Sequence, residues 1–590
     1  MDGLDDFGGD EDAALRYAIA LSLQDTGNSS SKTPIEIESD DDGDDDDDDL
    51  DKGPKYPRIT KEPEFHSGEL EPQIASLPKP SSVSQPSPSP APSGLAALGL
   101  DRKKMEEERL ARLRKRKAPE SEPESQGRRQ RQKLDTEFVV GPANKSGVHL
   151  PYPKGTVKKT WAKGFPRKDD IKIEEVLQKD ELELAVISSF QWDEQWMLSK
   201  IDYKKTDILC IAFASNEAQQ EEMKANVPSG ATIKFCFPPM MPAGSMHSKL
   251  QLLKYPSYLR VVVPSGNLVP YDWGETGVIE NIVFLIDLPR VDNPESTTST
   301  KLGLFGEELC YFLRAQGLKE SLVSSLKNYD FSEADRYRFV HTIGGSHVGD
   351  NWRRTGYCGL GRAVTSLGLN TTKDIEIDFL ASSLGSLNYD FLSTIYYAAQ
   401  GDDGMKEYGT RNAKSGKNKP PTQTKIHLKD KFRIYFPSHD TVIYSRGGRN
   451  AAGTICVQSK WWDSASFPRE LIRDCKSVRS GLLIHSKLML VCHSDSNESK
   501  PAFAYLGSAN VSESAWGRLV KERGTGNPKL TCRNWECGVI VPILPRDLAE
   551  DGSRPSSVSD FYDTIPVPMS IPGEAYGDIK SRRPWLFLEH

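Results

Sequence analysis

The sequence predicts an α/β protein of two similar lobes related by a pseudo-twofold axis, preceded by a disordered N-terminal tail. Three observations predict this. A His-x-Lys pattern with a later Ser-x-Asn pattern occurs twice, first from His247 to Asn267 and again from His485 to Asn510. Apolar runs surround both copies, as they do around buried strands. Residues 1–149, in contrast, combine low hydrophobicity with a run of Asp and a Pro/Ser-rich stretch, a composition that cannot bury enough apolar surface to fold.

The His and Lys of each copy are two residues apart on an apolar run, which predicts a strand. Side chains at positions i and i+2 of a strand point to the same face. We therefore expect His247 and Lys249 to project together, and His485 and Lys487 likewise. Two such strands facing each other would bring two imidazoles and two ammonium groups to one pocket, which suits a phosphodiester.

Further apolar runs at 207–213, 233–237 and 259–263 predict strands around the first copy, and residues 503–506 predict one beside the second. We place the lobe boundary near 327–335. The predicted organisation is a tail over 1–149, one lobe over 150–330 and a second over 331–590.

The residue types explain the chemistry. Lys ammonium groups and Asn amides can balance the charge of a reacting phosphoryl group without a metal. Imidazole titrates near neutral pH, so one His can attack phosphorus while the other protonates the departing oxygen. The pattern predicts covalent catalysis in two steps, with no cofactor and no metal.

The duplicated motif resembles the phospholipase D superfamily. An Asp usually stands six residues after each motif Lys in that superfamily, but Tyr255 and His493 stand there here. Absence of the Asp with retention of the Asn is typical of the tyrosyl-DNA phosphodiesterase branch. Further segments agree with this branch: Pro-Pro-Met-Met-Pro at 238–242, Ser-Ser-Leu-Gly-Ser-Leu at 382–387, Ala-Trp-Gly at 515–517 and Arg-Pro-Trp at 583–585. The resemblance runs from about residue 150 to the C-terminus and implies phospholipase D-like α/β/α lobes with the active site between them.

The resemblance also implies roles for the motif residues. His247 would attack the phosphorus of a 3′-phosphotyrosyl bond, and His485 would protonate the tyrosine oxygen and then activate water. The phosphate oxygens would be held by Lys249, Lys487, Asn267 and Asn510.

Two acidic or amide positions are implied to orient the imidazoles. Glu536 matches the acidic residue of the family that contacts one imidazole through its second nitrogen, a role that sets the tautomer and the ring angle. Which imidazole it contacts is left open by the sequence. For the other imidazole the family often uses a Gln, and here either Glu280 or Asn281 would substitute.

Several residues have two interpretations. Ser382, Ser383 and Ser386 are either DNA phosphate contacts or part of a plain polar loop. Trp585 is either a wall of the peptide-side pocket or core packing. Some family members place an aromatic residue four positions before the first His, where this chain has Ala243, which puts base stacking at that position in doubt.

The tail carries short motifs. Residues 11–23 resemble a ubiquitin-interacting motif, with Leu15, Ala18, Ile19 and Ser22 on one helix face, and residues 34–51 resemble a SUMO-interacting motif. The alternatives are a transient amphipathic helix and an apolar pair beside a solvated acidic run. The basic clusters 102–117 and 128–133 indicate nuclear localisation signals or, alternatively, a solvated linker.

The cysteine content indicates a reducing intracellular compartment, and the mildly basic charge beyond residue 150 suits a nucleic-acid backbone but is too small to establish one. The first 150 residues hold 32 acidic and 21 basic side chains, whereas the remainder holds 52 acidic and 55 basic. The nine Cys form no Cys-x-x-Cys pair and no signal peptide or long apolar span is present, which indicates a reducing compartment, no zinc site and no membrane.

The expected function is that of a nuclear DNA-repair phosphodiesterase. Its substrate would be the 3′-phosphotyrosyl bond between DNA and a topoisomerase-derived peptide, with a 3′-phosphate as product, and other 3′ blocking groups as further substrates. Partners would be such DNA ends, the peptide, and ubiquitin or SUMO conjugates. The alternatives are a phospholipase D-type lipid phosphodiesterase and a non-catalytic ubiquitin and SUMO adaptor.

Overall fold

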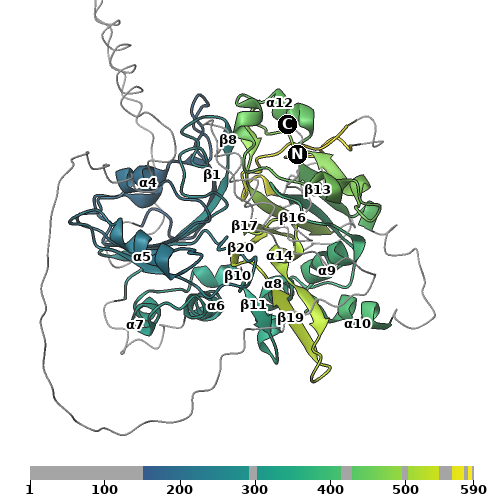
Figure 1. Ribbon diagram of the computed structural model, residues 1–590, viewed down its shortest axis with the longest axis horizontal. Helices are drawn as coiled ribbons and strands as arrows, with labels where there is room; N and C mark the ends of the chain where they lie inside the picture. Colours follow the sequence, from purple (N-terminus) through teal and green to yellow (C-terminus); the bar gives the residue numbers. More distant parts are fainter. Residues whose placement is uncertain are drawn as a thin grey trace, which may run out of the picture. The chain divides into compact units, whose positions relative to one another are not determined.

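Two large mixed β-sheets form the frame of the protein (Figure 1). The computed structural model describes residues 150–291, 302–413, 428–493, 502–543, 561–576 and 582–587. The expected tail motifs lie outside the described residues and stay predictions: 11–23, 34–51, 102–117 and 128–133.

The first sheet has eight strands from the earlier, blue-to-teal part of the chain in Figure 1. Their spatial order is β2 (Asp170–Ile171), β1 (Thr156–Thr160), β9 (Ile282–Pro289), β7 (Tyr258–Pro264), β6 (Gln251–Lys254), β3 (Leu184–Ser188), β4 (Asp207–Ile211) and β5 (Ile233–Cys236). The second sheet has seven strands, in the order β10 (Arg338–Thr342), β20 (Glu536–Ile543), β17 (Ala502–Gly507), β16 (Lys487–His493), β12 (Ile375–Leu380), β13 (Phe432–Phe436) and β14 (Ile472–Asp474).

The two sheets share one topology. The spatial orders are β1-β9-β7-β6-β3-β4-β5 in the first sheet and β10-β20-β17-β16-β12-β13-β14 in the second. Strands at the same position in the two sheets come in the same order along the chain. The first four pairings are antiparallel and the last two parallel in both sheets. The structure thus confirms two similar α/β lobes. The expected boundary at 330/331 falls between β9 and β10, and its position stays a prediction.

The central strands are mainly apolar because both of their faces are buried. In β7, Val261 and Val263 point into a core shared by the two sheets, while Val262 points to the outer core of the first lobe. In β16, Leu488 and Leu490 point into the shared core and Met489 points outward. This is the period-2 alternation of a strand with a core on each side.

Helices cover the outer faces of the sheets. The first lobe contributes α3 (Ile173–Leu177), α4 (Glu194–Lys200) and α5 (Glu217–Ala225), and the connection between lobes contributes α6 (Gly303–Ala315) and α7 (Glu320–Ser325). The second lobe contributes α8 (Gly356–Ser366), α9 (Tyr389–Ala399), α10 (Met405–Ala413), α12 (His439–Ile443), α13 (Ser459–Trp462) and α14 (Glu513–Trp516). Residues of α3 and α4 complete the outer core of the first lobe, α8 and α9 that of the second, and α6 packs into the shared core. Among the helices that the structure describes, none is long and apolar enough to cross a membrane.

Two small pairings join the lobes just before the motif histidines. The strand β15 (Leu483–Ile484) of the second lobe pairs in parallel with β8 (Ile279–Glu280) of the first. In the first lobe, Met246 forms a parallel bridge with Trp535 of the second. In each lobe, the backbone just before the motif His is therefore paired with a backbone segment of the other lobe.

The predicted strands at 207–213, 233–237, 259–263 and 503–506 are confirmed as β4, β5, β7 and β17. The prediction that the motif His and Lys lie within one strand is wrong. His247 and Lys249 precede β6, and His485 lies between β15 and β16, of which Lys487 is the first residue. The reason is the change of partner: the chain leaves a pairing with the other lobe and joins its own sheet, so strand pairing is interrupted at each His.

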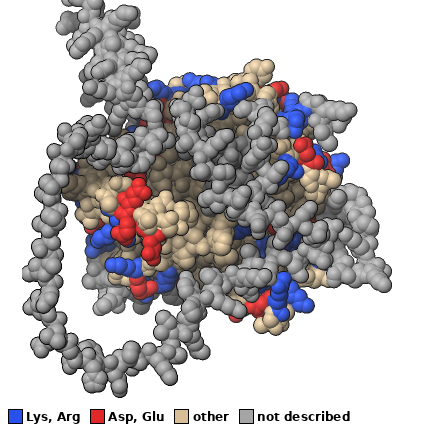
Figure 2. All heavy atoms as spheres, viewed as in Figure 1, with Lys and Arg blue, Asp and Glu red and all other residues tan. Residues whose placement is uncertain are grey.

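In Figure 2, acidic side chains gather on the left of the view, near α5, and basic side chains are scattered around them and along the other edges. The described side chains visible in this view form no continuous basic stripe of the kind that follows a nucleic-acid backbone. The excess of three basic charges beyond residue 150 therefore gives no argument for a binding surface on this side.

Arg479 links the lobes through a buried ion pair. Its guanidinium donates to the backbone oxygen of Thr160 at 2.9 Å and to the carboxylates of Asp170 at 2.8 Å and Glu280 at 3.3 Å. The side chain of Arg479 is 8% exposed, that of Asp170 2% and that of Glu280 0%. Without Arg479, the buried carboxylate of Glu280 would lose its ion pair, whereas Asp170 would keep its pair with Arg167.

We predict that Arg479→Met lowers the free energy of unfolding by about 3–5 kcal/mol, the usual cost of removing one partner of a buried pair. Urea denaturation would measure it. Arg336→Met is the matched control, because Arg336 pairs with Glu333 at an exposed site and should lose less than about 1 kcal/mol. Equal losses in the two variants would contradict the assignment of Arg479 as a lobe link.

Candidate active site

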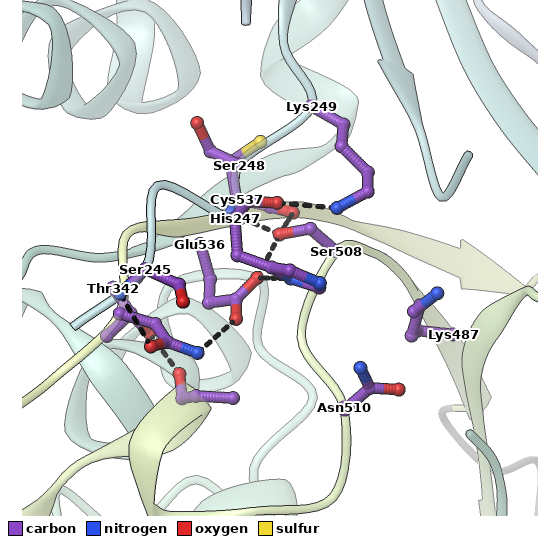
Figure 3. A network of polar contacts seen from close by, with 12 residues as sticks. Ser245, His247, Ser248, Lys249, Thr342, Lys487, Ser508, Asn510, Glu536 and Cys537 are labelled. Atoms are coloured by element: carbon purple, nitrogen blue, oxygen red, sulfur yellow. Dashed lines mark hydrogen bonds and ion pairs between the residues drawn. The ribbon is translucent and has the colours of Figure 1, made fainter. Parts of the chain in front are cut away.

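His247 is held from the second lobe by two contacts. Its backbone N–H donates to the oxygen of Trp535 at 3.0 Å. Its Nδ1 lies 2.8 Å from Oε2 of Glu536 (Figure 3). Since a carboxylate accepts the proton of Nδ1, the ring nitrogen left for chemistry is Nε2. Glu536 therefore contacts His247, which answers the question that the sequence left open.

A hydrogen-bond network fixes the Glu536 carboxylate. Ser508 donates its hydroxyl to Oε2, and Asn534 donates its amide to Oε1 at 3.1 Å. The amide oxygen of Asn534 in turn accepts the backbone N–H of Ser245 at 3.1 Å, just before the motif. Glu536 is 1% exposed, so this network rather than solvent satisfies its oxygens.

His485 has the mirror arrangement, with contacts from the first lobe. Its backbone N–H donates to the oxygen of Glu280 at 2.9 Å. Its Nδ1 lies 3.1 Å from Oδ1 of Asp272, within ion-pair range but without the alignment of the hydrogen bond that the Nδ1 of His247 makes to Glu536. Asp272 is 0% exposed.

The expectation that Glu280 or Asn281 orients this second imidazole is therefore wrong. The carboxylate of Glu280 accepts from Ser477 and Arg479 instead. The amide of Asn281 binds Ser265 and Asp272. Asp272 occupies the place beside His485.

Both lysines are buried and tied to their own motif. Lys249 Nζ donates to the backbone oxygen of His247 at 2.8 Å, and Lys487 Nζ donates to that of His485 at 2.5 Å. The same contact in both copies keeps each ammonium next to its imidazole. Burial lowers the pKa of Lys249 to about 8, and burial together with the charge of Lys249 lowers the pKa of Lys487 well below its ordinary value.

The two asparagines are fixed by their oxygens. Oδ1 of Asn510 accepts the backbone N–H groups of Ser382 at 3.2 Å and Ser383 at 3.1 Å, which leaves its NH₂ group available to an anion. In Figure 3 that nitrogen lies on the side of His247. Oδ1 of Asn267 accepts the backbone N–H of Gln191 at 3.4 Å, and the Asn267 NH₂ group donates one hydrogen to Oε1 of Gln191 at 3.4 Å.

A tryptophan braces each asparagine. Trp273 donates its indole N–H to the backbone oxygen of Asn267 at 3.0 Å, and Trp516 does the same to Asn510 at 2.9 Å. Both Trp residues stand six positions after their Asn. The duplication therefore extends past the Ser-x-Asn pattern into the turn that follows it.

A pocket opens beside His247, Asn510 and Glu536 and contains about 380 Å³ of empty space, including the part open to solvent. His485, both lysines and Asn267 are not among the residues that line it. Residues of both lobes line it: His247 from the first, and Ser383, Leu384, Gly385, Cys456, Trp461, Asn510, Ser512, Ala515, Asn534 and Glu536 from the second. Burial lowers the pKa of His247 and that of His485 to about 4, against the opposing effects of Glu536 and Asp272. Each imidazole is also influenced by both Lys ammonium groups, so the two motifs act on one electrostatic site.

The other predicted site residues are placed differently. Ser383 lines the pocket and Ser386 is exposed, but Ser382 is buried at 0% and holds Asn510 through its backbone, so it is a support of the site. Trp585 is 4% exposed within the core of the second lobe, where its ring stacks on His439 with centroids 6.1 Å apart. It is not among the residues that line the pocket.

The sequence reasoning missed Asp272, Asn534 and Phe190, whose ring centroid lies 5.2 Å from that of His247. A signal for Asp272 was present. Aligning Asn267…Trp273 with Asn510…Trp516 sets Asp272 opposite Ala515. The residue just before the matched Trp is therefore charged in the first copy and apolar in the second. No pattern in the sequence marks Phe190, because it lies some sixty residues before the motif it contacts.

A family model described as tyrosyl-DNA phosphodiesterase matches residues 156–577, which include both motifs and every polar group described above. The chain belongs to the tyrosyl-DNA phosphodiesterase family. Among curated proteins, tyrosyl-DNA phosphodiesterase 1 of Arabidopsis thaliana is 24% identical over 432 residues, covering 70% of this chain and 64% of that protein. The chain thus spans just under two thirds of the length of this relative.

Solved structures support the fold of this tyrosyl-DNA phosphodiesterase family member. The yeast tyrosyl-DNA phosphodiesterase has a TM-score of 0.51 at 16% identity, covering 73% of this chain and 100% of the yeast chain. A mutant of the same yeast protein has a TM-score of 0.52 at 16% identity, covering 73% and 98%. At this identity the likeness shows the fold alone, and it confirms the predicted phospholipase D-like class.

Two imidazoles buried in neutral form predict a protein that loses stability on acidification. Their folded-state pKa of about 4 lies below the unfolded value of about 6.5. Between these values the unfolded chain binds more protons, so the free energy of unfolding falls as the pH drops through this window. Urea denaturation from pH 6.5 to pH 4 should show a shallower dependence for His485→Gln than for the wild type. Identical slopes would contradict the buried neutral state.

Proposed function

We propose that this protein hydrolyses the 3′-phosphotyrosyl bond between DNA and a topoisomerase-derived peptide and leaves a 3′-phosphate. The observation that carries this proposal is the paired arrangement of two buried imidazoles, each with Nδ1 against a carboxylate and its backbone N–H on the opposite lobe. Family membership supports the substrate class.

In the first step, Nε2 of His247 attacks phosphorus and a P–N bond forms as the bond from phosphorus to the tyrosine oxygen breaks. His485 gives its proton to that oxygen. Glu536 accepts from Nδ1 of His247 at 2.8 Å and stabilises the positive charge that the imidazole gains on phosphorylation. Lys249, Lys487 and the NH₂ groups of Asn267 and Asn510 balance the charge on the phosphoryl oxygens.

In the second step, His485, now neutral, takes a proton from water as the water oxygen attacks phosphorus. The P–N bond breaks and His247 leaves as neutral imidazole, still protonated at Nδ1. The product is a 3′-phosphate. The same two steps would remove other groups joined to a 3′-phosphate by an ester oxygen.

Cellular context belongs to the same proposal. The basic clusters 102–117 and 128–133 support a nuclear location, and the motifs at 11–23 and 34–51 support recruitment to ubiquitin or SUMO conjugates. Binding of the isolated tail peptides to ubiquitin and to SUMO, measured by calorimetry, would test recruitment separately from catalysis.

We expect the full chain to release a 3′-phosphate from a 3′-phosphotyrosyl oligonucleotide in EDTA. His247→Ala should abolish release, because the imidazole that forms the P–N bond of the first step is then missing. His485→Asn should slow both steps and accumulate a covalent DNA adduct, seen as a shifted band on a denaturing gel. His439→Asn, at an exposed histidine on α12, should keep wild-type activity.

Failure of the wild type on this substrate would contradict the proposal. Cleavage of phosphatidylcholine vesicles instead would favour a lipid phosphodiesterase. Binding of the oligonucleotide without any turnover would favour an adaptor with a degenerate core.

A further inference from the structure

His247 and His485 have corresponding contacts with the opposite lobe, and these contacts differ at one residue. The N–H of His247 bonds to the oxygen of Trp535, and the next residue, Glu536, holds the ring. The N–H of His485 bonds to the oxygen of Glu280, and the next residue is Asn281. By this pseudo-symmetry, Asn281 stands where Glu536 stands in the other lobe.

The surroundings of Asn281 and Glu536 also correspond. Ser508 donates its hydroxyl to the carboxylate of Glu536, and Ser265 donates its hydroxyl to Oδ1 of Asn281 at 2.9 Å. Both serines begin the Ser-x-Asn pattern of their lobe. The difference lies in the other contact: Glu536 reaches an imidazole, whereas the Asn281 amide donates to Oδ1 of Asp272 at 3.0 Å.

Asp272 is therefore inserted between Asn281 and His485. Its Oδ1 faces both the amide of Asn281 and Nδ1 of His485, at 3.1 Å from the latter. Its Oδ2 accepts the backbone N–H of Asn267 at 2.6 Å. A carboxylate fully removed from solvent and held by these two hydrogen bonds cannot turn away from the imidazole without losing them.

The motif glycine makes room for this arrangement. A Cβ at Gly266 would lie 3.0 Å from Cγ of Asn281 and 3.2 Å from Cβ of Asp272. The corresponding residue of the second lobe is Ala509, which has no such inserted acid beside it. The Gly/Ala difference between Ser-Gly-Asn and Ser-Ala-Asn thus matches the presence of Asp272.

We propose that Asp272 is the positioning residue of His485, which fixes its Nδ1–H tautomer and sustains its protonated form for transfer to the leaving oxygen. This inference rests on the proposed phosphodiesterase activity. The charged groups that act on His485 are Asp272, Lys487 and Lys249, and of these only Asp272 favours the imidazolium. Glu280 contacts His485 through its backbone, and its carboxylate is engaged by Ser477 and Arg479.

Replacing Asp272 by a neutral residue would affect the two steps of the proposed reaction differently. In the first, a neutral partner in place of Asp272 would weaken the hold on the proton of His485. In the second, it would make His485 a poorer base toward water. Glu536, which contacts the other imidazole, would instead affect the attack on phosphorus.

The test uses Asp272→Asn in the full chain, with single-turnover rates on a 3′-phosphotyrosyl oligonucleotide at saturating protein across pH. We expect the alkaline limb of the first step to move to lower pH by about one unit or more, since an opposite charge at this distance shifts a pKa by about 1–3 units. We also expect kcat to fall about tenfold or more, as replacements of such outer partners do, with accumulation of the covalent adduct.

Two further variants separate positioning from folding. Asp287→Asn removes another buried carboxylate of the same lobe, the partner of Arg260, and should lower stability while leaving the pH profile unchanged. The exchange Asp272→Asn/Asn281→Asp keeps an amide-to-carboxylate hydrogen bond between the two positions but moves the charge away from His485, so the adduct should still accumulate.

The inference would be overturned if Asp272→Asn turned over substrate at the wild-type rate, with an unchanged pH profile and no adduct. The proposed function would then still stand. Full recovery by the exchange variant would overturn it as well, because a purely structural role would then be sufficient. Absence of turnover in the wild type would overturn the proposed function itself.

Discussion

The exchange of backbone hydrogen bonds between the lobes is the constraint on which the active site depends. His247 donates its N–H to Trp535 of the second lobe, and His485 donates its N–H to Glu280 of the first, at 3.0 and 2.9 Å. Neither lobe alone supplies all the contacts that hold its own histidine. A mutual arrangement of this kind holds the backbone of each histidine by a hydrogen bond to the other lobe, which suits a reaction that needs positional accuracy of a fraction of an ångström.

The side chains beyond these backbone contacts follow from burial. Lys249, Lys487, Glu536 and Asp272 are all buried, and an isolated charge there would be costly. Two cations and two anions compensate one another. Burial by itself would raise the pKa of Glu536 and that of Asp272, but contact with the imidazoles and ammonium groups holds both below their ordinary values. The carboxylates therefore stay ionised and able to accept from each Nδ1.

The sequence was sufficient for the parts of this site that repeat. His, Lys and Asn stand at matching positions in two copies, so the repeat alone predicts that they meet, and the apolar runs that fill both faces predict the strands around them. What could not be predicted depends on departures from the repeat. Asp272 takes the role expected of Glu280 or Asn281. Its mismatch with Ala515 can be seen in the sequence, but its place beside His485 follows only from the structure. The expected strand at each motif was wrong for the same reason, since the partner of that segment lies in the other lobe.

The charge balance also suggests how substrate binding prepares the reaction. With both imidazoles neutral and both lysines protonated, the two ammonium groups and two carboxylates of the free site sum to zero. A phosphodiester adds one negative charge to this buried set, and the group best placed to compensate it is an imidazole that already faces a carboxylate through Nδ1. In the proposed reaction, binding of the substrate would therefore itself raise the pKa of His485 and supply the proton that the leaving oxygen requires. A pocket that is neutral when empty avoids a standing excess of buried charge and still becomes an acid when it is filled.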